Sequence, residues 1–160
     1  MFWFSKIHDL LAHRDQVAQG RYGVIETRHG EFHSLELRPL PKLISWPEVW
    51  PVRLKFHARG PQDRCRLYFN QPRGMANFLA LKYIVSTDGT RYATFRAALA
   101  ALDQVAAIKR TDAIVCDAAN VRLSDRLMQR WGWEPHKPQR WHRNFIRRFY
   151  GEYPAGCLPA

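Results

Sequence analysis

Cysteine is scarce in this chain of 160 residues. The three cysteines, Cys65, Cys116 and Cys157, lie far apart and form no CxxC pair. The sequence therefore does not indicate a disulfide framework, and a reducing compartment is the simplest setting. Long apolar runs are also missing, because no stretch approaches the ~20 apolar residues that a membrane span requires. The amino terminus lacks the apolar centre and the cleavage site of a signal peptide, so we expect a cytoplasmic protein.

Acidic residues are few relative to basic ones. The chain holds 25 Lys and Arg against 14 Asp and Glu, which gives a formal net charge of +11. This balance attracts nucleic acid, phosphorylated cofactors or acidic partner surfaces, although a solvated arginine-rich surface has the same composition. The apolar fraction of 46% and the aromatic fraction of 13% are those of a globular chain. We expect one folded domain over residues 1–160.

The first half of the chain predicts one helix followed by strands. Apolar residues at helical spacing predict a helix at 3–18, within an amino-terminal segment 1–20. His29-Gly30 marks a turn between two strands, and the prolines of 39–51 indicate a connecting segment. Strands are predicted at 22–28, 31–38, 52–58 and 64–70, the last two as a hairpin.

The second half alternates strands and helices. The clearest helix is predicted at 90–110, where apolar residues recur every three or four positions. A second helix is expected from Asn120 or Ser124 to Trp131, where Gly132 stops it. Strands are predicted at 79–86, 113–117, 133–136 and 141–150, with a loop tail at 151–160. This order predicts an α/β domain with a mixed central sheet and helices on both faces.

A central strand that leads to an asparagine, and then to a helix ending in aromatic-Gly-aromatic, is the most informative pattern. Asn120, Gly132 and Trp133 carry it within the run DAIVCDAANVRLSDRLMQRWGWEPH. Over about residues 80–150 the chain resembles the carboxy-terminal half of the GNAT acyltransferase superfamily. The resemblance implies an acyl-CoA-dependent N-acyltransferase that moves an acetyl or other acyl group to the amine of a small molecule or peptide.

The resemblance also implies where an acyl-CoA would bind. In that family the cofactor lies between two splayed parallel strands, which by order are 79–86 and 113–117 here. Splaying leaves main-chain groups available to the pantetheine amides, and the start of the next helix offers N–H groups to the pyrophosphate. The cofactor-binding candidates are Gly89, Thr90, Arg91, Asn120 and Ser124.

The phosphate loop departs from the family pattern. That pattern reads Gln or Arg, two residues, Gly, one residue, and Gly or Ala. Residues 86–94, STDGTRYAT, stand at the expected place without it. The spacing does occur as Gln71, Gly74 and Ala76, but one strand earlier in the predicted order. The loop is therefore 86–94, or 71–76 if that strand order is wrong.

The catalytic groups are less clearly marked. Asp117 ends the central strand and is the candidate base for an attacking amine, although its position favours a role in capping the following turn or helix. Met128 stands where the family often has a proton-donating tyrosine, which leaves Tyr150 or Tyr92 as substitutes. A protein that keeps the fold without catalysis is therefore a second hypothesis.

No metal site is predicted, because the seven histidines form no set with ligand spacing. The alternative to an enzyme is a binding module for nucleic acid or an acidic partner. Residues 120–150 interleave basic and aromatic side chains, as surfaces that pair phosphates and stack bases do. Aromatic residues at these spacings also commonly face a core.

Overall fold

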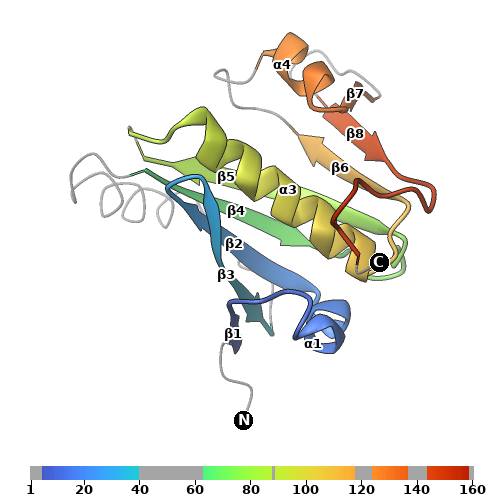
Figure 1. The fold of residues 1–160 in the computed structure, drawn as a ribbon. Helices are drawn as coiled ribbons and strands as arrows, with labels where there is room; N and C mark the ends of the chain where they lie inside the picture. Colours follow the sequence, from blue (N-terminus) through green and yellow to red (C-terminus); the bar gives the residue numbers. More distant parts are fainter. Residues whose placement is uncertain (1–4, 40–62, 88, 118–123, 137–143, 159–160) are drawn as a thin grey trace, which may run out of the picture.

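A mixed eight-stranded sheet organises the chain in the computed structural model, which describes residues 5–39, 63–87, 89–117, 124–136 and 144–158. The strand order is β1-β3-β2-β4-β5-β6-β8-β7 (Figure 1). The strands are β1 (Ser5–Ile7), β2 (Tyr22–Arg28), β3 (Glu31–Arg38), β4 (Arg64–Asn70), β5 (Phe78–Ser86), β6 (Ala113–Asp117), β7 (Glu134–Pro135) and β8 (Asn144–Arg148). The helices are α1 (Arg14–Gln19), α3 (Tyr92–Ile108) and α4 (Asp125–Arg130). The predicted α/β class with a mixed sheet is confirmed.

The parallel pairing in the described sheet is between β5 and β6, and the other neighbours run antiparallel. Helix α3 connects these two strands, as a parallel crossover requires. The predicted hairpin of β2 and β3 turns at His29 and Gly30, whose φ angles are 51° and 82°. Positive φ at both central residues is the geometry that continues the strand twist in a two-residue loop.

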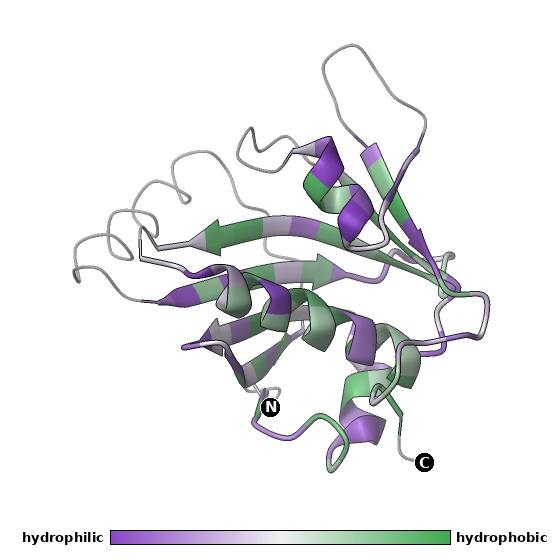
Figure 2. Cartoon of the chain, turned by 45° about the horizontal axis from the view of Figure 1, so that its top comes forward, coloured by the Kyte–Doolittle hydropathy of each residue, from purple (hydrophilic) through white to green (hydrophobic). Residues whose placement is uncertain are grey.

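The core lies between α3 and the sheet. Figure 1 shows α3 running across one face, where it packs against β2, β3 and β4. Figure 2 shows hydrophobic and hydrophilic residues interspersed along the strands, and in β2 the residues of both faces are buried from Gly23 to Thr27. The fully buried side chains include Ile25, Leu35, Leu67, Leu79, Leu102, Val105 and Ile114.

The amino-terminal helix expected at 3–18 is largely wrong. Residues Ser5–Ile7 form β1, which pairs with β3, and the helix α1 covers only Arg14–Gln19. Between them, Asp9 accepts hydrogen bonds from the N–H groups of Leu11 and Ala12, both at 3.0 Å. An aspartate that bonds its own downstream backbone favours a turn over a continuous helix.

The carboxy-terminal elements have the predicted order but are shorter. Helix α4 has six residues, β7 has two, and β8 ends at Arg148, while residues 141–143 of the predicted last strand lie outside the described residues. Residues 151–158 contain no helix or strand, as expected for the tail. The predicted strand at 52–58 and residues 40–51 of the proline-rich connection predicted at 39–51 lie outside the described residues. No helix within the described ranges is long and apolar enough to cross a membrane.

Candidate functional site

Strands β5 and β6 part from each other after four residue pairs. Their parallel register runs from Phe78 with Ala113 to Leu81 with Cys116. It does not extend to the next pair, Lys82 and Asp117, although both residues lie within strands. The last five residues of β5 continue along β4, and Figure 1 shows β6 diverging from them. Among the described residues, no strand pairs with 82–86 of β5 on the side of β6, which is where the sequence resemblance implied that the two strands splay.

A β-bulge marks the point of divergence. The register between β4 and β5 slips, so that Phe69 pairs with Leu81 and Tyr68 with Tyr83. Lys82 lies between these pairs as the extra residue, and it is exposed. A bulge bends its strand and increases the local twist, so it turns β5 away from the line of β6. The divergence thus has a local cause in the backbone of β5.

The loop before α3 lies at the divergent end of β5, as expected for residues 86–94. It is tied to β4, because Thr90 Oγ1 donates to the Arg64 carbonyl at 2.7 Å. Asp63 contacts the start of the helix, where its carboxylate accepts from Arg91 N at 2.9 Å and from Thr94 Oγ1 at 2.6 Å. The Arg91 Nε atom also donates to Asp63, at 2.7 Å.

Asp63 supplies a fixed negative charge at this helix N-terminus. Burial raises the pKa of its carboxyl, but hydrogen bonds from Thr94 and Arg91 outweigh that effect and lower the pKa to about 2. An anion there complements the positive end of the helix dipole. A pyrophosphate at Gly89–Arg91 would have to approach beside this carboxylate, using the exposed part of Arg91 and the N–H groups of the next residues.

The alternative phosphate loop lies elsewhere. Residues 71–77 connect β4 to β5, so Gln71, Gly74 and Ala76 stand at the beginning of β5. There β5 is paired with β6, because Phe78 lies opposite Ala113. The order of the strands thus leaves 86–94 as the segment between the diverging strand and α3.

An aromatic cluster joins the two helices that follow the diverging strands. Trp131, just after α4, stacks on Phe95 of α3 with 5.1 Å between ring centroids. Its Nε1 atom donates to the Tyr92 hydroxyl at 2.6 Å. Tyr92 is 49% exposed, so this hydroxyl is both oriented and accessible from solvent. Of the two substitute tyrosines, Tyr92 lies at the divergent end of β5.

The other predicted residues are not all brought together. Asp117 ends β6 opposite Asn144, at the divergent end. Ser124 caps α4 through its hydroxyl, which accepts from Leu127 N at 3.2 Å. Asn120 lies outside the described residues. Tyr150 is 72% exposed and donates its N–H to Asp112, before the start of β6. It therefore lies at the end of β6 opposite the gap.

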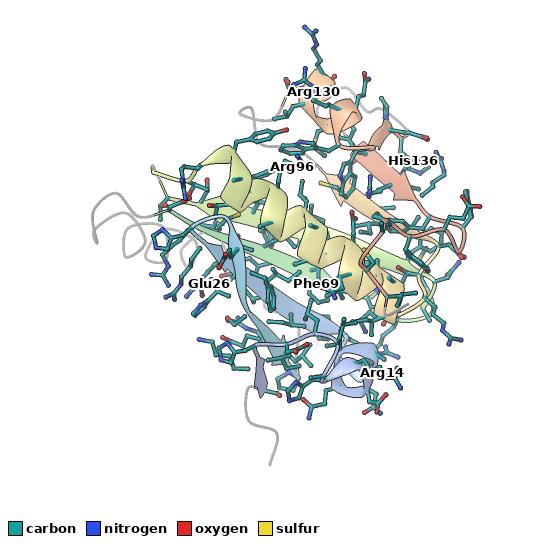
Figure 3. The ribbon with its side chains drawn as sticks, viewed as in Figure 1. Arg14, Glu26, Phe69, Arg96, Arg130 and His136 are labelled. Carbon is teal, nitrogen blue, oxygen red and sulfur yellow. The ribbon has the colours of Figure 1, made fainter. Side chains whose placement is uncertain are left out.

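A second cluster, which the sequence analysis missed, lies on the sheet face away from α3. Glu26 is only 5% exposed, and three arginines surround its carboxylate. Oε1 accepts from Arg28 Nη2 at 2.5 Å and from Arg64 Nη2 at 2.6 Å, and Oε2 accepts from Arg66 Nε at 3.3 Å. The hydroxyl of Thr27, the next residue, donates a hydrogen bond to the carbonyl of Thr94 in α3. Alternation therefore places Glu26 on the opposite face, and Figure 3 labels it beside β2.

Glu26 is ionised throughout the neutral range. Burial raises the pKa of this carboxyl, but hydrogen bonds from Arg64 and Arg28, together with the charge of Arg66, lower it to about 2. The sequence does contain a signal for this cluster. Glu26 and Arg28 are two residues apart on one strand, and Arg64 and Arg66 are two apart on its neighbour. Residues at that spacing share a face.

Three of the aromatic residues that the structure describes in the basic segment 120–150 are turned inward. Trp133, Phe145 and Phe149 are buried, with exposed fractions of 2%, 2% and 5%. Rings in this position contribute to the core and do not offer faces for base stacking. The described residues contain no group of three or more His, Cys, Asp or Glu side chains that is arranged to hold a metal ion.

Comparisons with known proteins show little similarity. No protein-family model matches the chain, and no curated protein matches it. Among solved structures, the chain is similar to a protein from Desulfovibrio desulfuricans that is assigned to the GNAT family of acetyltransferases. The TM-score is 0.43 and the sequence identity is 13%. The alignment covers 54% of this chain and 61% of that chain, which is less than two thirds of its length.

Proposed function

We propose that the protein transfers an acyl group from an acyl-CoA thioester to an amine at the gap between β5 and β6. The observation that carries this proposal is the end of pairing at Leu81 and Cys116, beside the bulge at Lys82. An open strand edge offers main-chain N–H and C=O groups at regular spacing. The two amides of a pantetheine arm are matched partners for such an edge, by the same bonding that adds a strand to a sheet.

The pyrophosphate of the acyl-CoA would lie near the loop at Gly89, Thr90 and Arg91. Arg91 is 65% exposed in its side chain, and Asp63 occupies only one side of its guanidinium. The remaining donors can pair with a phosphate. Asn120 and Ser124 are proposed as further contacts, on the resemblance described for the sequence.

The chemistry requires a neutral amine and a protonated leaving group. The amine nitrogen attacks the thioester carbonyl carbon, and the tetrahedral intermediate then breaks its C–S bond. The proton lost by the amine passes to a base, for which Asp117 is the candidate at the end of β6, directly or through water. The departing thiolate takes a proton from an acid. We assign that role to Tyr92, whose hydroxyl is held by Trp131 at the divergent end of β5.

Binding of the cofactor is the first test. Acetyl-CoA at a hundred times its dissociation constant should stabilise the native state by about 2.7 kcal/mol. For a domain of this size that corresponds to a Tm increase of roughly 5–10 °C. Adenosine 3′,5′-bisphosphate, which lacks the pantetheine arm, is the matched control and should give a smaller shift. Equal shifts with both ligands would show a nucleotide site without use of the strand edge, and no shift with either would contradict the proposal.

Turnover is the second test, because a fold that has lost catalysis would pass the first. Release of the CoA thiol in the presence of a primary amine should be measurable above spontaneous hydrolysis. Tyr92→Phe removes the proposed acid while keeping the ring that contacts Trp131. We expect this variant to reduce kcat roughly 100-fold or more, with unchanged binding of acetyl-CoA. Binding without any release would support the hypothesis of a non-catalytic relative.

A further inference from the structure

Trp131 connects the two helices that follow the parting strands. Helix α3 follows β5, α4 follows β6, and Trp131 is the first residue after α4. The indole of Trp131 stacks on Phe95 with 29° between the ring planes, and it lies against Tyr92 with 5.5 Å between ring centroids. Tyr92 and Phe95 are three residues apart on α3, so their side chains share one side of that helix. A single side chain beyond β6 therefore contacts two rings on the helix that follows β5.

The backbone of Trp131 is attached to α3 as well as its ring. The Trp131 carbonyl accepts from Arg147 Nη1 at 2.6 Å, and Arg147 Nε donates to Asp103 of α3 at 2.9 Å. The side chains of Arg147 and Asp103 are only 18% and 13% exposed, so salt and solvent screen this ion pair little. Asp103 lies about two helical turns beyond Phe95. Trp131 is thus held by α3 at two separate places, which fixes the orientation of its indole.

The hydrogen bond between Trp131 and Tyr92 has only one possible direction. An indole N–H group donates and cannot accept, so the Tyr92 oxygen is the acceptor, at 2.6 Å from Nε1. The hydroxyl hydrogen of Tyr92 must then point away from Trp131. Among the described residues none accepts that hydrogen, and Tyr92 is 49% exposed. The hydrogen is therefore available to a group that binds at the divergent end of β5.

We propose that Trp131 is a positioning residue, which holds the Tyr92 hydroxyl so that its hydrogen is directed to the departing thiolate. The inference rests on the proposed function, because it assigns a role within the same acyl transfer. When the C–S bond of the tetrahedral intermediate breaks, the sulfur takes the Tyr92 proton and the Tyr92 oxygen keeps the electron pair. The negative charge on that oxygen stays hydrogen-bonded to the indole N–H group. Water then returns a proton to Tyr92, and the base releases to water the proton that it took from the amine.

The substitution Trp131→Phe removes the N–H donor and keeps an aromatic ring against Phe95. An oriented hydroxyl acts in the chemical step, so we expect this variant to lower kcat roughly tenfold. Its KM for acetyl-CoA and its thermal shift with acetyl-CoA should equal those of the wild type. Phe95→Leu keeps the donor but removes the ring that supports the indole. This second variant should lower kcat about threefold, and it provides the test if Trp131→Phe does not fold.

A double-mutant cycle with Tyr92→Phe separates positioning from a merely structural role. In the Tyr92→Phe background there is no hydroxyl to orient, so adding Trp131→Phe should lower kcat by less than about twofold further. A full tenfold loss in that background would show that the two side chains act independently. Trp131 would then support the structure of the site without positioning the acid, and the inference would be overturned.

Trp133→Phe is the matched control, because it makes the same substitution two residues away, at a core side chain that is 2% exposed. It should lower the Tm and leave kcat unchanged. Wild-type kcat in Trp131→Phe, or an equal loss of kcat in Trp133→Phe, would overturn the inference while leaving acyl transfer intact. Absence of thiol release by the wild-type protein with any primary amine would instead contradict the proposed function, and the role of Trp131 would fall with it.

Discussion

Replacing Glu26 by glutamine removes the negative charge that holds three arginines together. The pKa of this carboxyl falls from 4.5 to about 2 in the folded protein. Each pKa unit corresponds to about 1.4 kcal/mol, so the ionised form contributes about 3 kcal/mol to folding at neutral pH. Because the carboxylate is nearly fully buried, solvent screening reduces this value little. We therefore expect Glu26→Gln to lower the Tm by roughly 6–12 °C.

The loss should depend on pH in a defined direction. A depressed pKa gives stability that is complete above the unfolded value of 4.5 and disappears as pH falls toward about 2. The difference between wild type and Glu26→Gln should thus be largest at pH 7 and should shrink at pH 3. Urea denaturation of both proteins at the two pH values measures it.

Glu36 provides a matched control on the same sheet. The Glu36 carboxylate accepts a hydrogen bond from Arg38 Nε at 3.0 Å, but the Glu36 side chain is 33% exposed. Partly exposed pairs of this kind contribute about 0–1 kcal/mol. Glu36→Gln should therefore cost much less than Glu26→Gln. Equal costs for the two variants, or a Glu26 effect that is the same at both pH values, would refute the reasoning.

Three further predictions concern the loop before α3, the turn after α4 and the gap. Asp63→Asn should lower the free energy of unfolding by at most about 2 kcal/mol at pH 7, because the pKa of Asp63 is lowered from 3.8 to about 2 while solvent screens its largely exposed partner Arg91. Urea denaturation should show that this loss of stability diminishes below pH 4. Gly132→Ala should lower the free energy of unfolding by roughly 1–3 kcal/mol, since Gly132 has a φ of 83° and an added Cβ would meet Arg147. Gly74 has a similar φ but no neighbouring atom near an added Cβ, so an equal loss of stability in Gly74→Ala would exclude the clash with Arg147 as the cause. Iodoacetamide should alkylate Cys116 before Cys65, because burial raises the pKa of the Cys65 thiol to about 12. Acetyl-CoA should slow the alkylation of Cys116, and an unchanged alkylation rate by mass spectrometry would show that acetyl-CoA does not bind between β5 and β6.

The sequence predicted elements whose pattern is local and long. Helix α3 was predictable because seventeen residues keep one apolar stripe, and the β2–β3 hairpin because His29-Gly30 marks its turn. The buried run of β6 likewise indicated a central strand. Such elements are decided by spacing within a single window of sequence.

The features that were missed depend on partners distant in the chain. The sequence pattern places Asp63 in a turn, yet its carboxylate contacts Arg91, which lies twenty-eight residues later. In the sequence, Glu26 is one polar residue within a strand, and only the register between β2 and β4 shows that it lies opposite Arg66. The amino-terminal segment failed for a related reason, since Ile7 and Val17 are both buried but belong to a strand and a short helix. Apolar spacing alone does not distinguish these arrangements.

Amide hydrogen exchange along β5 tests the central claim most directly. Residues 82–86 are paired with no described strand on the side of β6, whereas residues 78–81 of the same strand are paired with β6 and provide an internal control. With saturating acetyl-CoA, exchange should slow at 82–86, where main-chain groups would bond the pantetheine, and change little at 78–81. Unchanged exchange at 82–86 in the presence of bound acetyl-CoA would contradict the proposed use of this edge.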